Sequence, residues 1–206
     1  MERFLVSVAG WAFVAITAMA ATVGAQQIPP SVPLVGIGDD RTWVAQEPME
    51  YVIGSTSTKI IVPAGFVTDL ASIPKWFWGP PLFLTPAGQY SRASIIHDYL
   101  YWTQKCTREQ ADRLLVIAMK ESSVKKFDEN TIYDGVQDFG GSAWKSNAAD
   151  RQRGLPRILP KEYRRPADPN MTWPTYSAQL MAAGVKSLEA VDDGSYCHYG
   201  DSTTVP

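Results

Sequence analysis

The hydrophobic pattern in the middle of the chain has helical spacing. Between residues 89 and 102, apolar or aromatic side chains recur every three or four residues, at Tyr90, Ala93, Ile96, Leu100 and Tyr101. This spacing places them on one face of a helix that ends near Lys105. Thr107, with Gln110 three residues later, is typical of a capping box and predicts the start of a second helix.

The second helix is expected to run to about Glu121. It would bury an apolar face made of Ala111, Leu114, Leu115, Ala118 and Met119. Because only a few residues join the two helices, we expect them to pack antiparallel as a helical hairpin. A third helix is predicted over residues 129–144, with an inward face made of Ile132, Val136, Phe139 and Trp144.

Strand signals precede these helices. The β-branched runs 51–53 and 59–62 flank a Gly-Ser-Thr-Ser-Thr turn, which predicts an antiparallel hairpin. The fold class is therefore α+β, with a small antiparallel sheet packed against a three-helix core that contains an antiparallel helical hairpin. This core domain is expected over residues 42–146, and a chain of 206 residues is long enough for one such domain.

Residues 147–206 are expected to lie outside this core. The part up to Pro174 is rich in Arg and Pro and predicts an irregular surface strap. Its basic side chains could contact anionic lipid or cell-wall polymer, or could form an ordinary solvated face. A short amphipathic helix is predicted over residues 175–191, and the last residues are expected to fray.

The N-terminus resembles an export segment. Arg3 is followed by an uncharged, mostly apolar stretch, and the small residues Val23-Gly24-Ala25 favour cleavage after Ala25. Residues 1–25 are therefore predicted to be a signal peptide, with export to the periplasm or beyond. The apolar stretch is also long enough to cross about 30 Å of hydrocarbon, so a retained inner-membrane anchor is the alternative, and a buried helix a third. Residues 26–41, rich in Pro and Gly, predict a linker or an extended arm.

Charge and cysteine content limit the partners and the compartment. The net charge is −2 and no run of Lys or Arg forms a stripe that could follow a phosphate backbone, so the usual electrostatic surface of a nucleic-acid binder is missing. Cys106 and Cys197 both lie in the part expected to be exported, where they could pair or remain as two free thiols.

An aromatic loop, formed by Trp76, Phe77, Trp78, Phe83 and Leu84, could enter a membrane interface, line an acyl pocket or cap the core. The sequence does not indicate an oligomeric state.

The candidate chemistry centres on one of the two histidines. His97 and Asp98 are adjacent, so on a helix they point about 100° apart and cannot bond each other. Asp112 lies fifteen residues after His97, and an antiparallel hairpin would bring its carboxylate back to the imidazole. Such a dyad is typical of a general base, and the hydroxyl of Tyr101, with that of Tyr133, could complete its network.

Asp98 is then available for a hard cation. Asp69 and backbone carbonyls of the following loop could add ligands, and calcium takes six to eight oxygens. Zinc would need nitrogen or sulfur ligands that the chain lacks unless the tail with His198 folds back. The structural alternatives are a buried His97 bonded to a carbonyl, Asp98 paired with an Arg, and Asp69 in a turn.

Four segments carry a family resemblance. In chain order they are "VPAGFVTDLASIPKWFW", "IIHDYLYW", "REQADRLLVIAM" and "IYDGVQDFGGSAWK". Together they resemble a bacterial and phage family known as domain of unknown function 1353, over about residues 52–145. The resemblance implies a compact domain shared by bacteria and phage, with no established activity.

A second, local resemblance carries chemistry. His97-Asp98-x-x-Tyr101, followed by an antiparallel helix with Asp112, is similar to the paired catalytic helices of secreted phospholipases A2. The resemblance implies that His97 activates water, that Tyr101 and Asp112 orient it, and that Asp98 holds calcium. The cysteines that bridge those helices in that family have no counterpart here, and its Gly-rich calcium loop has no clear copy.

The function expected from these observations is calcium-assisted, phospholipase A2-like ester hydrolysis, with Asp69 as a further metal ligand. A metal-dependent hydrolase of another envelope polymer, such as peptidoglycan, would instead place His97, Asp98 and Asp69 around a transition metal. The non-enzymatic alternative is a structural or interaction module in which the His-Asp network is scaffold. The expected partners are accordingly a lipid or cell-envelope substrate and the membrane surface.

Overall fold

The structure is a computed structural model that describes residues 33–39, 41–70 and 89–206. These residues belong to one compact unit, 31–206. The predicted signal peptide or anchor and the aromatic loop with Trp76 and Trp78 lie outside the described residues. Among the residues that are described, no helix combines the length and the apolar character needed to cross a membrane.

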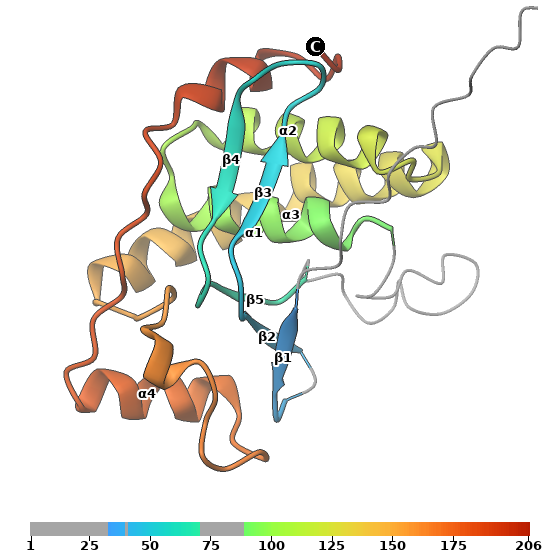
Figure 1. Cartoon of the computed structure of the whole chain (residues 1–206). Helices are drawn as coiled ribbons and strands as arrows, with labels where there is room; N and C mark the ends of the chain where they lie inside the picture. Colours follow the sequence, from blue (N-terminus) through green and yellow to red (C-terminus); the bar gives the residue numbers. More distant parts are fainter. Residues whose placement is uncertain (1–32, 40, 71–88) are drawn as a thin grey trace, which may run out of the picture. The chain divides into compact units, whose positions relative to one another are not determined.

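The strands form two small antiparallel sheets (Figure 1). Strands β1 (Leu34–Ile37), β2 (Thr42–Ala45) and β5 (Val67–Thr68) make a three-stranded sheet in the order β1-β2-β5. Strands β3 (Met49–Val52) and β4 (Lys59–Val62) make the second sheet, which is the predicted hairpin. The α+β class is confirmed, and part of the range expected to be a linker or an extended arm supplies β1.

The β3–β4 hairpin is fastened to the helices. Alternate residues of β4 are buried, so Ile60 and Val62 face the core while Lys59 and Ile61 face outward. At the turn, the N–H of Gly54 donates to the carboxylate of Glu121 over 2.8 Å, and the Tyr51 hydroxyl donates to the same carboxylate. The alternation of buried and exposed residues along β4 and the two bonds to Glu121 together hold one face of the hairpin against the helices.

Three helices form the main core. Helices α1 (Ser91–Thr103) and α2 (Arg108–Glu121) are antiparallel, and α3 (Lys126–Gln152) contacts both. The predicted capping box is present, since Gln110 N donates to Thr107 Oγ1 over 3.2 Å and Thr107 N donates to Gln110 Oε1 over 2.9 Å. Helix α1 is buried on most of its surface because β4, β5, α2 and α3 all contact it.

Helix α3 differs from its prediction in length and in one inward residue. It begins at Lys126 and ends at Gln152, so the expected change from core to strap near residue 146 falls inside a helix. Phe139 was expected inward, and this is wrong, because 61% of its surface is exposed. The face that meets the core instead follows four-residue intervals through Ile132, Val136, Gly140 and Trp144. Phe139 lies about 100° off that stripe.

The strap carries a second, smaller core. After α3 the chain is irregular apart from the short 3-10 helix η2 (Lys161–Tyr163), and α4 (Trp173–Ala182) follows. Helix α4 is shorter than the predicted 175–191, because Gly184, at φ 74°, ends it in a left-handed turn. Its buried residues pack with those of the three-stranded sheet in a cluster made of Ile37, Val44, Val67, Leu159, Tyr176, Leu180 and Val185.

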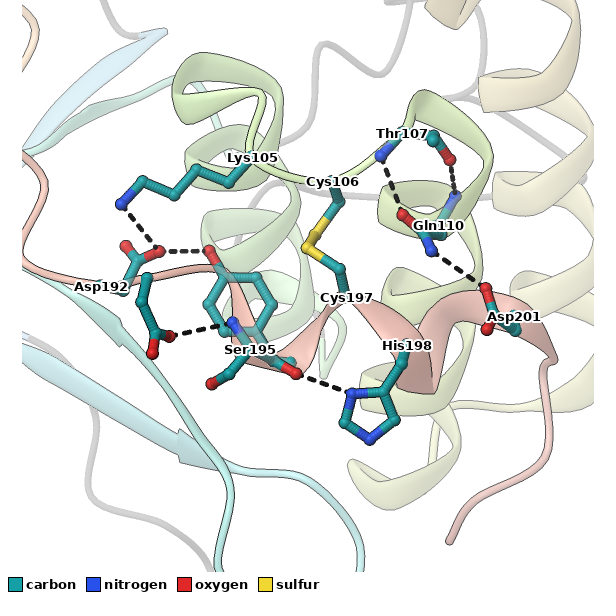
Figure 2. Close-up of a disulfide and its surroundings, with 11 residues drawn as sticks. Lys105, Cys106, Thr107, Gln110, Asp192, Ser195, Cys197, His198 and Asp201 are labelled. Carbon is teal, nitrogen blue, oxygen red and sulfur yellow. Dashed lines mark hydrogen bonds and ion pairs between the residues drawn. A yellow bond between two sulfur atoms is a disulfide. The ribbon is translucent and has the colours of Figure 1, made fainter.

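The C-terminal residues do not fray as expected. The 3-10 helix η3 (Ser195–Asp201) lies on α2, and Cys197 forms a disulfide with Cys106 at the α1–α2 turn (Figure 2). The Cα atoms of the two cysteines are 5.2 Å apart. Of the two states left open for the cysteines, the structure therefore shows the paired one. The disulfide and the burial of the Tyr196 side chain together hold the tail in place.

Candidate active site

The site is built on the facing sides of α1 and α2. His97 of α1 and Asp112 of α2 are joined by a contact of 2.8 Å between Nε2 and Oδ1. Asp112 is fully buried, whereas 9% of the His97 side chain is exposed. The contact expected from the fifteen-residue spacing is present, because the tight turn between the helices returns α2 along α1.

Asp112 has four hydrogen-bond donors around it. Oδ1 accepts from His97 and from the Tyr101 hydroxyl at 2.6 Å, and Oδ2 accepts from Arg108 Nη1 at 3.1 Å and Gln137 Nε2 at 2.9 Å. A buried carboxylate is costly unless it is bonded and its charge is compensated. These donors satisfy both conditions and fix the rotation of the carboxylate.

The network determines which imidazole nitrogen carries the hydrogen. A carboxylate accepts hydrogen bonds, so Nε2 of His97 is the donor toward Asp112, and Nδ1 keeps its lone pair. Within the described part of the chain, Nδ1 has no hydrogen-bond partner. His97 can therefore act as a base through Nδ1 while Nε2 remains bonded to Asp112.

Tyr101 supports the dyad in two ways. Its ring lies over the imidazole of His97, with centroids 4.1 Å apart, and its hydroxyl donates to Asp112. Burial, reinforced by the bond to Asp112, raises the pKa of Tyr101, so the phenol stays neutral and remains a donor. Tyr133 packs half-buried against the core, and no hydrogen bond in the described part of the chain joins it to Asp112.

Asp98 points to a different element from His97. Its Oδ2 accepts from the Thr68 hydroxyl of β5 and from the backbone N–H of Asp69 at 3.2 Å. Burial raises the pKa of Asp98 well above its usual range, and the nearby Asp69 carboxylate raises it further, while Arg157 acts in the opposite direction. The structure thus brings Asp98 and Asp69 together, separate from the Asp112 network.

These two carboxylates do not make up a calcium site by themselves. Calcium needs six to eight oxygens, and one oxygen of Asp98 is already occupied by two donors. Nowhere in residues 33–39, 41–70 and 89–206 do three or more His, Cys, Asp or Glu side chains gather as metal ligands. His198 does not complete a zinc set there either, since it lies on η3 with Nδ1 bonded to the Ser195 carbonyl at 2.7 Å (Figure 2).

The sequence interpretation missed Arg108 and Gln137. Arg108 stands four residues before Asp112 on the same helix, a spacing at which opposite charges meet, so a local signal was available. Gln137 had no such signal, because its partner lies on another helix. Gly140 was also missed as a neighbour of the site, although it occupies the inward stripe of α3.

Comparison with known proteins finds a family model that matches the part of the chain carrying most of the site. Residues 43–136 match the family model described as Protein of unknown function (DUF1353). The chain carries a DUF1353 region, as its motifs predicted. His97, Asp98, Tyr101, Arg108 and Asp112 all lie within the DUF1353 region, and Gln137 follows directly after it.

One relative carries a similar stretch. The chain is 34% identical over 82 residues to "Uncharacterized protein y4jT" of Sinorhizobium fredii (strain NBRC 101917 / NGR234). The alignment covers 38% of this chain and 23% of that protein, so the chain spans less than a quarter of the relative's length. No solved structure matches the chain.

Proposed function

We propose that the protein is an ester hydrolase in which His97 is the general base. The observation that carries the proposal is the buried His97–Asp112 pair, in which Asp112 accepts a hydrogen bond from Nε2–H and the lone pair of Nδ1 is left for a water molecule. A base of this kind typically contributes a factor of about 10² to 10⁴ in rate.

The reaction would run through water. Nδ1 of His97 takes a proton from the water, whose oxygen attacks the ester carbonyl carbon. The imidazolium that forms is stabilised by Asp112, which stays in place because Tyr101, Arg108 and Gln137 also donate to it. When the tetrahedral intermediate collapses, the imidazolium returns the proton to the departing alkoxide, and an acid and an alcohol are released.

Phospholipid is the proposed substrate class. The His97-Asp98-x-x-Tyr101 arrangement with Asp112 on an antiparallel helix resembles the catalytic helices of secreted phospholipases A2, which supports a lipid ester over other esters. An exported protein would meet such lipids in the envelope, and the Cys106–Cys197 disulfide supports an oxidising compartment. Asp98 and Asp69 are the residues to which calcium would bind, but the described residues do not fit it, and no step of the proposal depends on it.

Scaffolding is the second candidate function. It is favoured by the burial of His97, of which 7% of the residue surface is exposed, and by the complete satisfaction of Asp112. The metal-dependent hydrolase has less support, because His97 and Asp98 contact different elements instead of converging.

The test is release of fatty acid from vesicles of phosphatidylcholine and phosphatidylglycerol, with calcium or with a chelator. His97→Asn and Asp112→Asn are each expected to lower kcat by about 10² to 10⁴. Asp192→Asn is the matched control, because Asp192 is also a buried carboxylate that accepts from two tyrosines, Tyr99 and Tyr196, and contacts no histidine.

Two results decide between the candidates. Hydrolysis that depends on His97 and Asp112 but survives Asp192→Asn supports the enzyme. A folded wild-type protein that hydrolyses neither these vesicles nor soluble p-nitrophenyl esters would overturn the hydrolase proposal in favour of the scaffold.

A further inference from the structure

Helix α3 reaches the His97–Asp112 pair from outside the α1–α2 hairpin. Gln137 donates through Nε2 to Asp112 Oδ2 over 2.9 Å. One turn later, Gly140 lies against the Tyr101 hydroxyl, which in turn donates to Asp112. Two residues of α3 therefore contact the two groups that hold His97.

Gln137 acts on the orientation of the carboxylate. Asp112 has two oxygens, and His97 requires Oδ1 to stay in the plane of its imidazole. Gln137 and Arg108 occupy Oδ2 from different helices, so rotation of the carboxylate would break bonds on both sides. The α1–α2 hairpin supplies Arg108, and α3 supplies the second donor.

Gly140 acts on Tyr101 through close approach. A Cβ atom at position 140 would lie 2.4 Å from the Tyr101 hydroxyl oxygen and 3.5 Å from Arg108 Nη1. The first distance is far below van der Waals contact, so any side chain there would push the hydroxyl away from Asp112. At Gly141 a Cβ atom would meet nothing within 4 Å. Of two adjacent glycines, the site therefore requires the first and not the second.

We propose that α3 is a positioning element of the site, and that Gln137 and Gly140 are positioning residues. They hold Asp112 and Tyr101 so that His97 keeps its hydrogen on Nε2 and its lone pair on Nδ1. The catalytic consequence rests on the proposed hydrolase function. The tautomer of His97 does not, because it can be measured without a substrate.

The first test uses Gly140→Ala with Gly141→Ala as the matched control. Nitrogen-15 NMR of the imidazoles reports which ring nitrogen carries the hydrogen, and His97 and His198 are the two histidines of the chain. In the wild type, His97 is expected as the Nε2–H form, whereas His198, which donates from Nδ1 to Ser195, is expected as the opposite form. Gly141→Ala should leave the His97 signals unchanged, and Gly140→Ala should shift them toward a mixture of tautomers.

A double-mutant cycle isolates the close approach. Gly140→Ala should lower Tm by several degrees, because the hydroxyl has to move within a packed core. In a Tyr101→Phe background the hydroxyl is absent, so the same change should leave Tm level or raise it, as is also expected of Gly141→Ala in the wild-type background. An equal loss of Tm in both backgrounds would contradict the role of Gly140.

Gln137→Met tests the second contact without any clash. Gln104→Met is its control, since Gln104 Nε2 also tethers α1 to α3, by donating to the Trp144 carbonyl over 2.7 Å, but does not contact Asp112. Gln137→Met should lower kcat by about ten- to a hundredfold with little change in KM, and should shift the nitrogen-15 signals of His97 toward a mixture of tautomers. Gln104→Met should do neither.

The outcomes separate this inference from the proposed function. If the wild type hydrolyses no ester but the His97 tautomer responds to Gly140→Ala and Gln137→Met, the hydrolase proposal fails and the positioning role stands. If hydrolysis depends on His97 but neither variant changes kcat or the tautomer, the positioning role is overturned.

Discussion

At the scale of single residues, Asp112 and Asp98 of the α1–α2 hairpin lie in different environments, and the candidate site depends on this difference. Asp112 accepts hydrogen bonds from four side chains, and these bonds orient the donors around its carboxylate. The donors are His97, Tyr101, Arg108 and Gln137. Asp98 lies beside another carboxylate, and its raised pKa favours the protonated form. Asp112 is placed to stabilise an imidazolium on His97, whereas protonation of Asp98 relieves its repulsion with the nearby Asp69 carboxylate.

Asp98 leads to a prediction about pH. Its pKa is higher in the folded than in the unfolded protein, so the native state binds more protons and stability falls as pH rises from about 4 toward the raised pKa. Asp98→Asn mimics the protonated form, so the variant should gain Tm relative to wild type at pH 7 and show little difference at pH 4. Urea or thermal unfolding at the two pH values measures this.

The exposed Asp134 on α3 provides the control, and Asp134→Asn should change stability little at either pH. A wild-type protein that is relatively more stable at pH 7 than Asp98→Asn would contradict the prediction. If calcium raises the Tm of wild type at pH 7 but not that of Asp98→Asn, the carboxylates bind the ion after all.

The elements show which parts of the site local sequence determines. The α1–α2 hairpin follows from an apolar stripe, a capping box and a short turn, and these local signals are sufficient to predict Asp112 opposite His97. The length of α3 and the exposure of Phe139 did not follow from such signals. An adjacent glycine pair is typical of a weakened helix, yet α3 continues through Gly140 and Gly141. Here α3 is held by the close packing of Gly140 against Tyr101 and by the bond from Gln104, at the end of α1, to the Trp144 carbonyl.

The start of α2 gives a prediction at this scale. Thr107→Ala removes the side-chain oxygen that accepts from Gln110 N, and should lower the free energy of unfolding by about 1 kcal/mol. Thr172→Ala is the matched control, because Thr172 is the N-cap of α4 but caps no backbone N–H of that helix. Chemical denaturation of both variants measures the difference, and equal losses would show that the capping box adds nothing to α2.

At the scale of the whole molecule, the C-terminal tail is part of the described unit. The disulfide joins Cys197 to the α1–α2 turn, Asp192 accepts from Tyr99 of α1, and Asp201 accepts from Gln110 of α2 (Figure 2). Lys120 at the end of α2 also donates to the Thr203 carbonyl over 2.6 Å. The tail thus bridges both helices that carry the dyad.

Removal of the crosslink should therefore affect stability strongly. The cysteines are 91 residues apart in sequence, and a loop of about that size contributes roughly 4 kcal/mol in the chain-entropy model. Cys106→Ser with Cys197→Ser should lower the free energy of unfolding by that order and increase hydrogen exchange in residues 195–206. Reduced wild type should behave like the double variant, and protection that survives in both would show that side-chain contacts hold the tail without the disulfide.

The sequence by itself determined what depends on neighbours along the chain. These local features are the β3–β4 hairpin, the helical stripes, the capping box and the angle between His97 and Asp98. The short turn between α1 and α2 makes the two helices antiparallel, which is enough to place Asp112 opposite His97. The tertiary structure alone decided the partners that meet from distant segments: Gln137 and Gly140 on α3, Thr68 against Asp98, and the tail on α2. Packing selects these contacts among many that the sequence allows, since burial requires each polar group to find a donor or acceptor wherever the fold brings one within reach.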